Sequence, residues 1–226
     1  MGLKSVPFAG LCIIATTLTV MAAGLPLTIE PVNTEGLPEV GEEWLSENPY
    51  RADKVGEEVW QKAVDIGASG FNQNCARCHG LGAVSGGLAP DVRFLEAAEA
   101  GDEWYVERFR YGYTQDGTTK MPAMGDLLGQ KAAWAIRTYI ETRPEDGALD
   151  GHADRLKAIR DELAAGNGDE VVLQAELMDL AGQIPTASGA PRADSAALRA
   201  AIALDGTDQS RKHASEMLTI GLSAAK

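Results

Sequence analysis

The feature that most constrains this chain is the pentapeptide Cys75-Ala76-Arg77-Cys78-His79. On a helix, two cysteines three positions apart lie about one turn apart and point to the same side. Both thiols can then bond to the two vinyl groups along one edge of a porphyrin, and the histidine that follows can bind the iron. Cys-x-x-Cys-His is the attachment pattern of a c-type haem. The pattern therefore predicts covalent haem attachment at Cys75 and Cys78, with His79 as an iron ligand.

Two other kinds of site use paired cysteines, and both fit this chain poorly. A structural zinc site takes four Cys or His ligands, usually as two pairs, whereas the other Cys and His residues are scattered, at Cys12, His152 and His213. A thioredoxin-like pair follows a strand of a βαβ unit, and no such pattern surrounds Cys75. A disulfide between Cys75 and Cys78 would leave His79 without a role. Haem attachment is the favoured interpretation.

The N-terminal segment has the pattern of a secretory signal. Lys4 is its only charge, and residues 6–23 are apolar apart from three threonines. Small residues near Gly24 suit a cleavage site, so residues 1–24 are predicted to be a signal peptide. About 20 apolar residues can also span a bilayer, so an uncleaved anchor is the alternative. Export to the periplasm agrees with covalent haem attachment, which takes place outside the cytoplasm, and cleavage would remove Cys12.

The chain is acidic, with 33 Asp and Glu against 20 Lys and Arg. Nucleic-acid binding needs clustered Lys and Arg, so this balance argues against it. Residues 25–54 are especially acidic, and their four prolines prevent a continuous helix. This stretch is either a solvated arm that wraps the domain or a surface that steers a basic redox partner.

A core domain is predicted over residues 55–145, between a first and a last helix. Val55 to Asn74 has helical apolar spacing, and Gly67 and Phe71 share one face. Gly129 to Thr142 has aromatic and aliphatic residues on one broad side, and Pro144 ends it. We expect these helices to cross, with Gly67 against an aromatic residue such as Tyr139 or Trp134.

Two segments between these helices suggest contacts to a haem. The glycine-rich loop after His79 leads to Pro90, and it can present a carbonyl to the second ring nitrogen of His79, which would fix the ring and raise its basicity. The alternative is an ordinary turn. A short helix from Glu103 to Tyr113 supplies core aromatics and four candidates for bonding the haem propionates: Arg108, Arg110, Tyr111 and Tyr113.

A second iron ligand is predicted in the segment Met121-Pro122-Ala123-Met124. In cytochromes that carry electrons, a thioether fills the iron position opposite the histidine and raises the reduction potential. An isolated methionine would usually be core filler, but the pentapeptide at Cys75 gives this one a partner. We predict Met121 as the sixth ligand, with Met124 as the alternative.

Together these motifs resemble a class I cytochrome c over about residues 55–143. The resemblance is carried by Gly67-x-x-x-Phe71, Cys75-x-x-Cys78-His79-Gly80, Pro90-Asp91, Met121-Pro122 and the aromatic last helix. It implies an all-α domain around one haem c, with one haem edge at the surface. Three stretches are most similar to periplasmic cytochromes that accept electrons from PQQ-dependent methanol and other alcohol dehydrogenases: residues 71–74, 111–113 and 119–124. This implies such a dehydrogenase as donor and another cytochrome or a terminal oxidase as acceptor.

Residues 146–226 extend beyond a minimal cytochrome and are predicted to be an Ala-rich helical extension. Apolar residues mark one helix at Leu156, Ile159 and Leu163, and a second at Val172, Leu173, Leu177, Leu180 and Ile184; a later segment carries Leu198, Ile202, Met217 and Leu218. Large apolar residues are few. The extension is either an appendage, packed on itself or partly disordered, or a module that docks a partner.

The sequence favours an electron carrier over an enzyme. A haem peroxidase or sensor needs an open iron position, and a peroxidase also needs a distal acid–base residue. A bound Met121 would fill that position, and the spare histidines, His152 and His213, both lie in the extension. A carrier for a different periplasmic dehydrogenase or oxidase is the nearest alternative.

Overall fold

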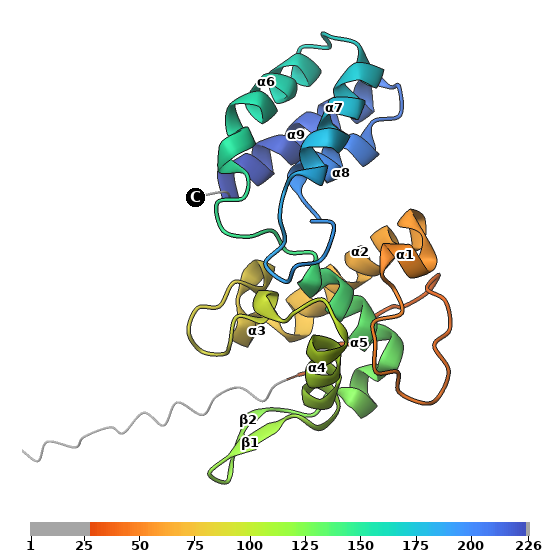
Figure 1. The fold of residues 1–226 in the computed structure, drawn as a ribbon, viewed down its shortest axis with the longest axis vertical. Helices are drawn as coiled ribbons and strands as arrows, with labels where there is room; N and C mark the ends of the chain where they lie inside the picture. The colour runs from red at the N-terminus through yellow and green to blue at the C-terminus, as the bar shows by residue number, and fades with distance from the viewer. Residues whose placement is uncertain (1–27, 225–226) are drawn as a thin grey trace, which may run out of the picture.

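The computed structural model describes residues 28–224, so the predicted signal peptide, residues 1–24, lies outside the described residues. The fold is α-helical with one short β-hairpin (Figure 1), and this confirms the predicted all-α class with additional C-terminal helices. The first part of the chain contains α1 (Ala52–Val55), α2 (Glu57–Asn74), α3 (Ala76–His79), α4 (Glu99–Tyr111), β1 (Tyr113–Gln115), β2 (Thr118–Met121) and α5 (Gly125–Glu141). The C-terminal part contains α6 (Ala153–Ala164), α7 (Glu170–Gly182), α8 (Ala196–Ala203) and α9 (Asp208–Ala224). Within residues 28–224, no helix has the length and apolarity needed to cross a membrane.

Helices α2 and α5 cross at Gly67, as the sequence predicted. A Cβ atom at Gly67 would lie 2.0 Å from the carbonyl oxygen of Ala135 and 2.8 Å from Cβ of Tyr139. One turn further, the rings of Phe71 and Tyr139 lie 5.4 Å apart. The contact therefore uses Tyr139 and the backbone of Ala135, while Trp134 is buried against Tyr105, with ring centroids 6.3 Å apart.

Three helix boundaries differ from the predicted ones, two of them at glycines. The first predicted helix is divided at Gly56, whose positive φ of 79° ends α1 before α2 begins. The last helix begins at Gly125 rather than at Gly129, and Gly129 interrupts it after the first turn, with a φ of 77°. Helix α4 begins at Glu99 rather than Glu103.

The predicted end of α4 was also wrong, because Tyr113 belongs to a β-hairpin. Strand β1 pairs antiparallel with β2, and Tyr113 lies opposite Met121. The turn residues Asp116 and Gly117 both have positive φ, 51° and 72°, as a tight two-residue hairpin turn requires. The hairpin projects from the end of the molecule opposite the C-terminal helices (Figure 1).

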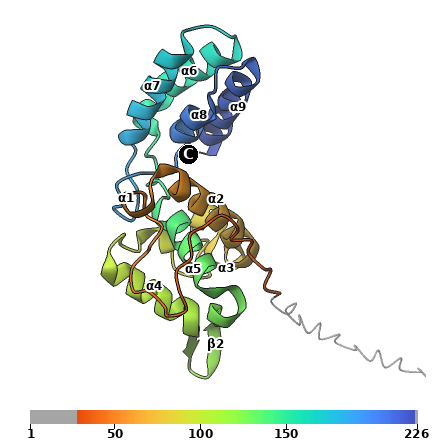
Figure 2. The same ribbon diagram turned by 90° about the vertical axis from the view of Figure 1, so that its right-hand side faces the viewer.

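The acidic arm, residues 28–51, runs across the helices as an irregular chain (Figure 2). Its glutamates are exposed, which fits the predicted acidic surface. The arm is nevertheless anchored: Leu37, Asn48 and Tyr50 are buried, and the amide of Leu45 donates to Oε1 of Gln130 on α5 at 2.6 Å. The arm therefore has exposed carboxylates and an anchored backbone.

The C-terminal helices α6 to α9 pack on one another in a compact group at one end of the molecule (Figure 1). Most of the predicted apolar positions are buried, including Leu156, Ile159 and Leu163 on α6. Val172 on α7 and Ile202 on α8 are exceptions, at 61% and 51% exposure. Val172 is not among the buried residues of α7, which include Leu173, Leu177 and Leu180. We call residues 150–224 the C-terminal module.

Candidate functional site

The two cysteines and the histidine lie together where α2 continues into α3. The amide of Cys75 donates to the carbonyl of Phe71 at 2.7 Å, and the amide of His79 donates to that of Cys75 at 3.0 Å. These bonds make a single helical turn in which Cys75 is half-buried and Cys78 is exposed, and both thiols are free. The structure therefore brings the three predicted attachment residues to one place.

The ring of His79 is held by the loop that follows it. Nδ1 lies 2.9 Å from the carbonyl oxygen of Pro90. A carbonyl can only accept, so Nδ1 carries the proton and Nε2 keeps its lone pair free for a metal. The Phe71 ring lies 6.5 Å from the imidazole, centroid to centroid. The predicted loop-to-histidine contact is thus present, and Pro90 supplies the carbonyl.

Asn74, which precedes the first cysteine, anchors the acidic arm beside the site. Its Oδ1 accepts from the amide of Glu30 at 2.7 Å, and its Nδ2 donates to the carbonyls of Glu30 and Gly70 at 3.1 Å. Sequence reasoning missed this role. The signal that could have found it is an asparagine on the otherwise apolar face that precedes Cys75.

The two candidate methionines differ in burial and in backbone setting. Met121 is half-buried at the end of β2. Met124 is 4% exposed, and its amide donates to the carbonyl of Phe109 at 2.8 Å. A Cβ at Gly112 would lie 2.4 Å from the carbonyl oxygen of Met121, so this glycine lets the methionine segment pack tightly on the end of α4.

The four propionate candidates form two pairs in which an arginine lies over a tyrosine ring. The Arg108 guanidinium lies 5.3 Å from the Trp104 ring and 5.1 Å from the Tyr113 ring. Arg110 lies 5.0 Å from Trp44 and 4.8 Å from Tyr111. The tyrosines and the arginines thus stack on one another, and their role toward propionates stays a prediction.

Thiolate chemistry is unfavourable at Cys75. Burial, with a smaller contribution from Cys78, raises the pKa of the Cys75 thiol to about 12. A neutral thiol is a weak metal ligand and a weak nucleophile. Among residues 28–224, no cluster of three or more His, Cys, Asp and Glu side chains could hold a metal ion. The raised pKa counts against a thioredoxin-like thiolate at Cys75.

The residues present fit a covalently attached haem. The donor set combines two thiols on one helical turn with an imidazole whose Nε2 is free. The loop after His79 also exposes large apolar side chains, Leu81 at 78% and Leu88 at 77%. Exposed apolar groups of this size indicate an apolar partner, and a porphyrin ring is one.

Comparison with known proteins gives the family. Residues 62–140 match the family described as cytochrome c oxidase, cbb3-type, subunit III. The chain is 50% identical over 116 residues to cytochrome c550 of Pseudomonas aeruginosa, a match that covers 51% of this chain and 78% of the relative. It is 27% identical over 106 residues to the quinohemoprotein alcohol dehydrogenase ADH IIB of Pseudomonas putida, covering 46% of this chain and 15% of that protein.

A third relative is the cbb3-type cytochrome c oxidase subunit FixP of Rhizobium meliloti, 30% identical over 89 residues, with 37% of this chain and 31% of the relative covered. No solved structure gives a significant match. The family match ends at residue 140, before the C-terminal module begins. The site geometry and these relatives together show that the chain belongs to the class I cytochrome c family and that it is an electron-transfer protein with one covalently bound haem c.

Proposed function

We propose that Cys75 and Cys78 hold the haem through thioether bonds and that His79 and Met121 are its axial ligands. The observation that carries this proposal is the hydrogen bond from Nδ1 of His79 to the Pro90 carbonyl, because it leaves Nε2 as the only metal-binding atom of the ring. Met121 is favoured over Met124 because its side chain is only half-buried, whereas the Met124 side chain is already packed in the core.

In this function the haem supplies the reversible one-electron chemistry of its iron. The chain supplies a fixed ligand set and a surface through which a partner approaches. The Pro90 carbonyl holds the His79 ring in one orientation. Gly112 and Pro122 hold the Met121 backbone against the end of α4. Because these contacts need not change with the electron count, little reorganisation accompanies each transfer.

The choice of methionine can be tested by substitution. We expect Met121→Ala to abolish the near-infrared absorption band typical of methionine bound to ferric haem and to permit carbon monoxide binding to the ferrous protein. Met124→Ala should retain the band and instead lower stability by about 2–5 kcal/mol, because it opens a cavity in the core. Loss of the band in Met124→Ala with retention in Met121→Ala would reverse the assignment.

We further propose that the electron donor is a PQQ-dependent alcohol dehydrogenase and that the acceptor is another cytochrome or a terminal oxidase. Three observations support this: the resemblance of residues 71–74, 111–113 and 119–124, a relative named as a quinohemoprotein alcohol dehydrogenase, and the exposed carboxylates of the acidic arm. The predicted signal peptide places the encounter in the periplasm. A different periplasmic dehydrogenase or oxidase as partner is the alternative.

The donor can be tested by stopped-flow reduction with a purified PQQ-dependent alcohol dehydrogenase. We expect saturable reduction whose second-order rate constant falls at least roughly tenfold from low to high salt, since exposed charges steer the encounter. Replacing Glu42 and Glu43 by Lys should slow reduction at low salt. The matched control replaces Asp179 and Glu216, exposed carboxylates of the C-terminal module, by Lys. Reduction that neither saturates nor responds to salt would remove this donor and leave the electron carrier intact.

A further inference from the structure

Arg93 is a buried guanidinium that lies beside the loop holding His79. It is 4% exposed and belongs to the 3-10 turn Val92–Phe94, two residues after Asp91. Its Nε lies 3.0 Å from Oδ1 of Asp91, and its Nη2 lies 2.8 Å from Oδ2. The backbone amide of Arg93 also donates to Oδ1 of Asp91 at 3.1 Å. This two-pronged pair fixes the residue that directly follows Pro90.

The rest of the loop between His79 and Pro90 is tied to the same carboxylate. The amide of Ser85 approaches Oδ2 of Asp91 at 3.4 Å, and the Ser85 hydroxyl donates to the carbonyl of Ala89 at 2.5 Å. At the start of the loop, a Cβ on Gly80 would lie 1.9 Å from the carbonyl oxygen of Val84. The loop therefore folds closely on itself, and Asp91 connects its two halves.

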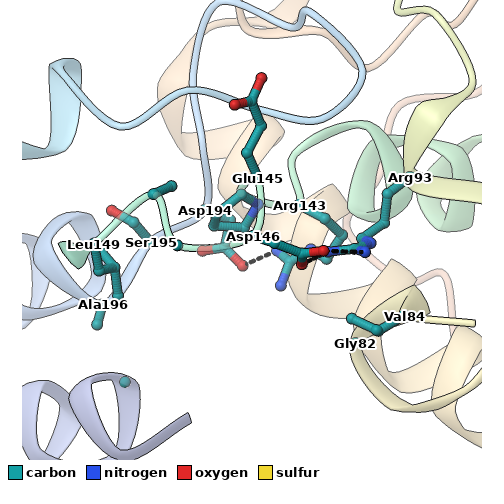
Figure 3. Close-up of a pocket in the computed structure, with 14 residues that line it drawn as sticks. Gly82, Val84, Arg93, Arg143, Glu145, Asp146, Leu149, Asp194, Ser195 and Ala196 are labelled. Atoms are coloured by element: carbon teal, nitrogen blue, oxygen red, sulfur yellow. Dashed lines mark hydrogen bonds and ion pairs between the residues drawn. The ribbon is translucent and has the colours of Figure 1, made fainter. Parts of the chain in front are cut away.

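Arg93 also reaches the connector that leads from α5 to the C-terminal module. Its Nη1 lies 2.7 Å from Oδ1 of Asp146, a carboxylate whose side chain is 77% exposed. Figure 3 shows both arginine–aspartate pairs of this region, Arg93 with Asp146 and Arg143 with Asp194, beside a pocket of about 300 Å³. One guanidinium thus joins the histidine loop to the start of the extension.

The charges in this network are stable at neutral pH. Burial raises the pKa of Asp91, but hydrogen bonds from the side chain and amide of Arg93 and from the amide of Ser85 outweigh it, so the net pKa lies below the ordinary value of 3.8. The same guanidinium lowers the pKa of Asp146. Near pH 7 both carboxylates are therefore ionised and paired.

We propose that Arg93 is a positioning residue for the axial histidine. Arg93 holds Asp91, and through Asp91 it keeps the Pro90 carbonyl at Nδ1–H of His79. Asp146, on the connector to the C-terminal module, in turn holds Arg93. The inference rests on the proposed role of His79 as an iron ligand. A well-aligned Nδ1–H···O bond makes the imidazole a stronger donor, which favours ferric iron, so loosening the network should raise the reduction potential.

The direction in which the reduction potential changes distinguishes a positioning role of Arg93 from a direct effect of its charge on the iron. Removal of the positive guanidinium would, through space, favour ferric iron and lower the potential. Loss of positioning acts in the opposite direction. For Arg93→Leu in the haem-loaded full chain, we expect the ferrous-to-ferric ratio at a fixed applied potential to rise at least threefold. At 59 mV per tenfold change for one electron, this corresponds to a rise of about 28 mV in the reduction potential. Exchange of the His79 Nδ1 proton, followed by NMR in the ferrous state, should accelerate about tenfold.

A milder variant covers the case in which Arg93→Leu does not fold. Asp146→Asn cuts only the exposed arm of the network, and Glu145→Gln is its matched control, because Glu145 is the neighbouring exposed carboxylate of the same pocket. Both variants remove one negative charge at nearly the same place. We expect faster Nδ1 proton exchange and a larger rise of the ferrous fraction in Asp146→Asn than in Glu145→Gln.

The outcomes distinguish this inference from the proposed function. Equal effects of Asp146→Asn and Glu145→Gln, or a lowered or unchanged potential in a folded Arg93→Leu protein, would show that Arg93 serves only the fold. If the unmodified protein lacked a low-spin spectrum with histidine and methionine bound, the axial-ligand assignment itself would fail. Arg93→Lys, which keeps the charge and loses the two-pronged geometry, should behave like Arg93→Leu in proton exchange.

Discussion

At the scale of single residues, Gly67 decides how closely α2 and α5 approach. The carbonyl of Ala135 occupies the space that any side chain at position 67 would need, at 2.0 Å from an added Cβ. Backbone cannot move aside as the end of a flexible side chain can. The same close approach brings Phe71 against Tyr139 and so supports the helix end from which Cys75 projects.

Replacing Gly67 by Ala should therefore destabilise the protein although alanine is the better helix former. We expect a loss of about 3 kcal/mol in the free energy of unfolding, at the upper end for overpacking, measured by denaturant titration. Gly182 is the matched control, a helical glycine with no atom within 4 Å of an added Cβ. Gly182→Ala should leave stability unchanged or raise it by up to about 1 kcal/mol. A neutral Gly67→Ala variant would show that the helices separate without cost.

At the scale of elements, a buried ionic cluster joins the acidic arm to α4 and α5. Asp102 on α4 accepts from Nε of Arg137 at 2.8 Å and from the amide of Asn48 at 2.8 Å. Arg51 binds Glu141 through Nη2 at 2.8 Å. Burial raises the pKa of Glu141, although Arg137 and Arg51 oppose it. Hydrophobic patterning cannot reveal such a cluster, because its members read as surface residues.

Breaking this cluster should be costly. In Asp102→Asn, Arg137 would stay buried with only Glu141, 3.9 Å from its Nη2, as counter-charge. Removal of one partner of a buried pair costs about 3–5 kcal/mol. The measurement is thermal or denaturant unfolding followed by circular dichroism. Glu47→Gln, an acid-to-amide change in the exposed pair with Lys54, is the control and should leave the unfolding midpoint in place. Equal effects of the two variants would contradict the assigned role of Asp102.

At the scale of the whole molecule, the C-terminal module is fastened to the first helices by backbone bonds and by arginine–aspartate pairs. The amide of Asp194 donates to the carbonyl of Thr142 at 2.9 Å, and the amide of Ala97 donates to that of Ser188 at 2.9 Å. Asp194 also pairs with Arg143 at 2.5 Å and with Arg199, which in turn pairs with Asp65 on α2. The module lies at the end of the molecule opposite the hairpin (Figure 1).

This attachment should weaken in acid. Burial raises the pKa of Asp194, but the charges and hydrogen bonds of Arg143 and Arg199 lower it by more. The net pKa therefore lies below the ordinary value of 3.8. A depressed folded-state pKa means that the stabilisation is complete above about pH 4 and is lost as the pH falls through the folded-state value. The stability difference between the unmodified protein and Asp194→Asn should therefore shrink as the pH falls below about 4, as measured by unfolding at each pH. A constant difference over that range would contradict the assignment.

The features of this protein that depend on short spacing along the chain could be predicted without the structure. Cys75, Cys78 and His79 lie within five consecutive residues, so a single helical turn is enough to bring them together. The α2–α5 contact was predictable because Gly67 and Tyr139 each lie in a strongly periodic helix. The helices of the extension were predictable for the same reason, although two of their predicted apolar positions, Val172 and Ile202, are exposed. The Asp116-Gly117 turn signal was also present, but the predicted helix ended at Tyr113 and no strand was predicted after it.

The polar contacts between distant segments could not be predicted and are seen only in the folded chain. Nothing in the spacing of Arg93, Asp146 and Asp194 indicates that they meet, because ion pairs between loops have no sequence period. The anchoring of Glu30 by Asn74 and the burial of Asp102 with Arg137 are of the same kind. Apolar periodicity records which face of one helix is buried, whereas a buried charge is defined by the partner that another part of the chain brings to it.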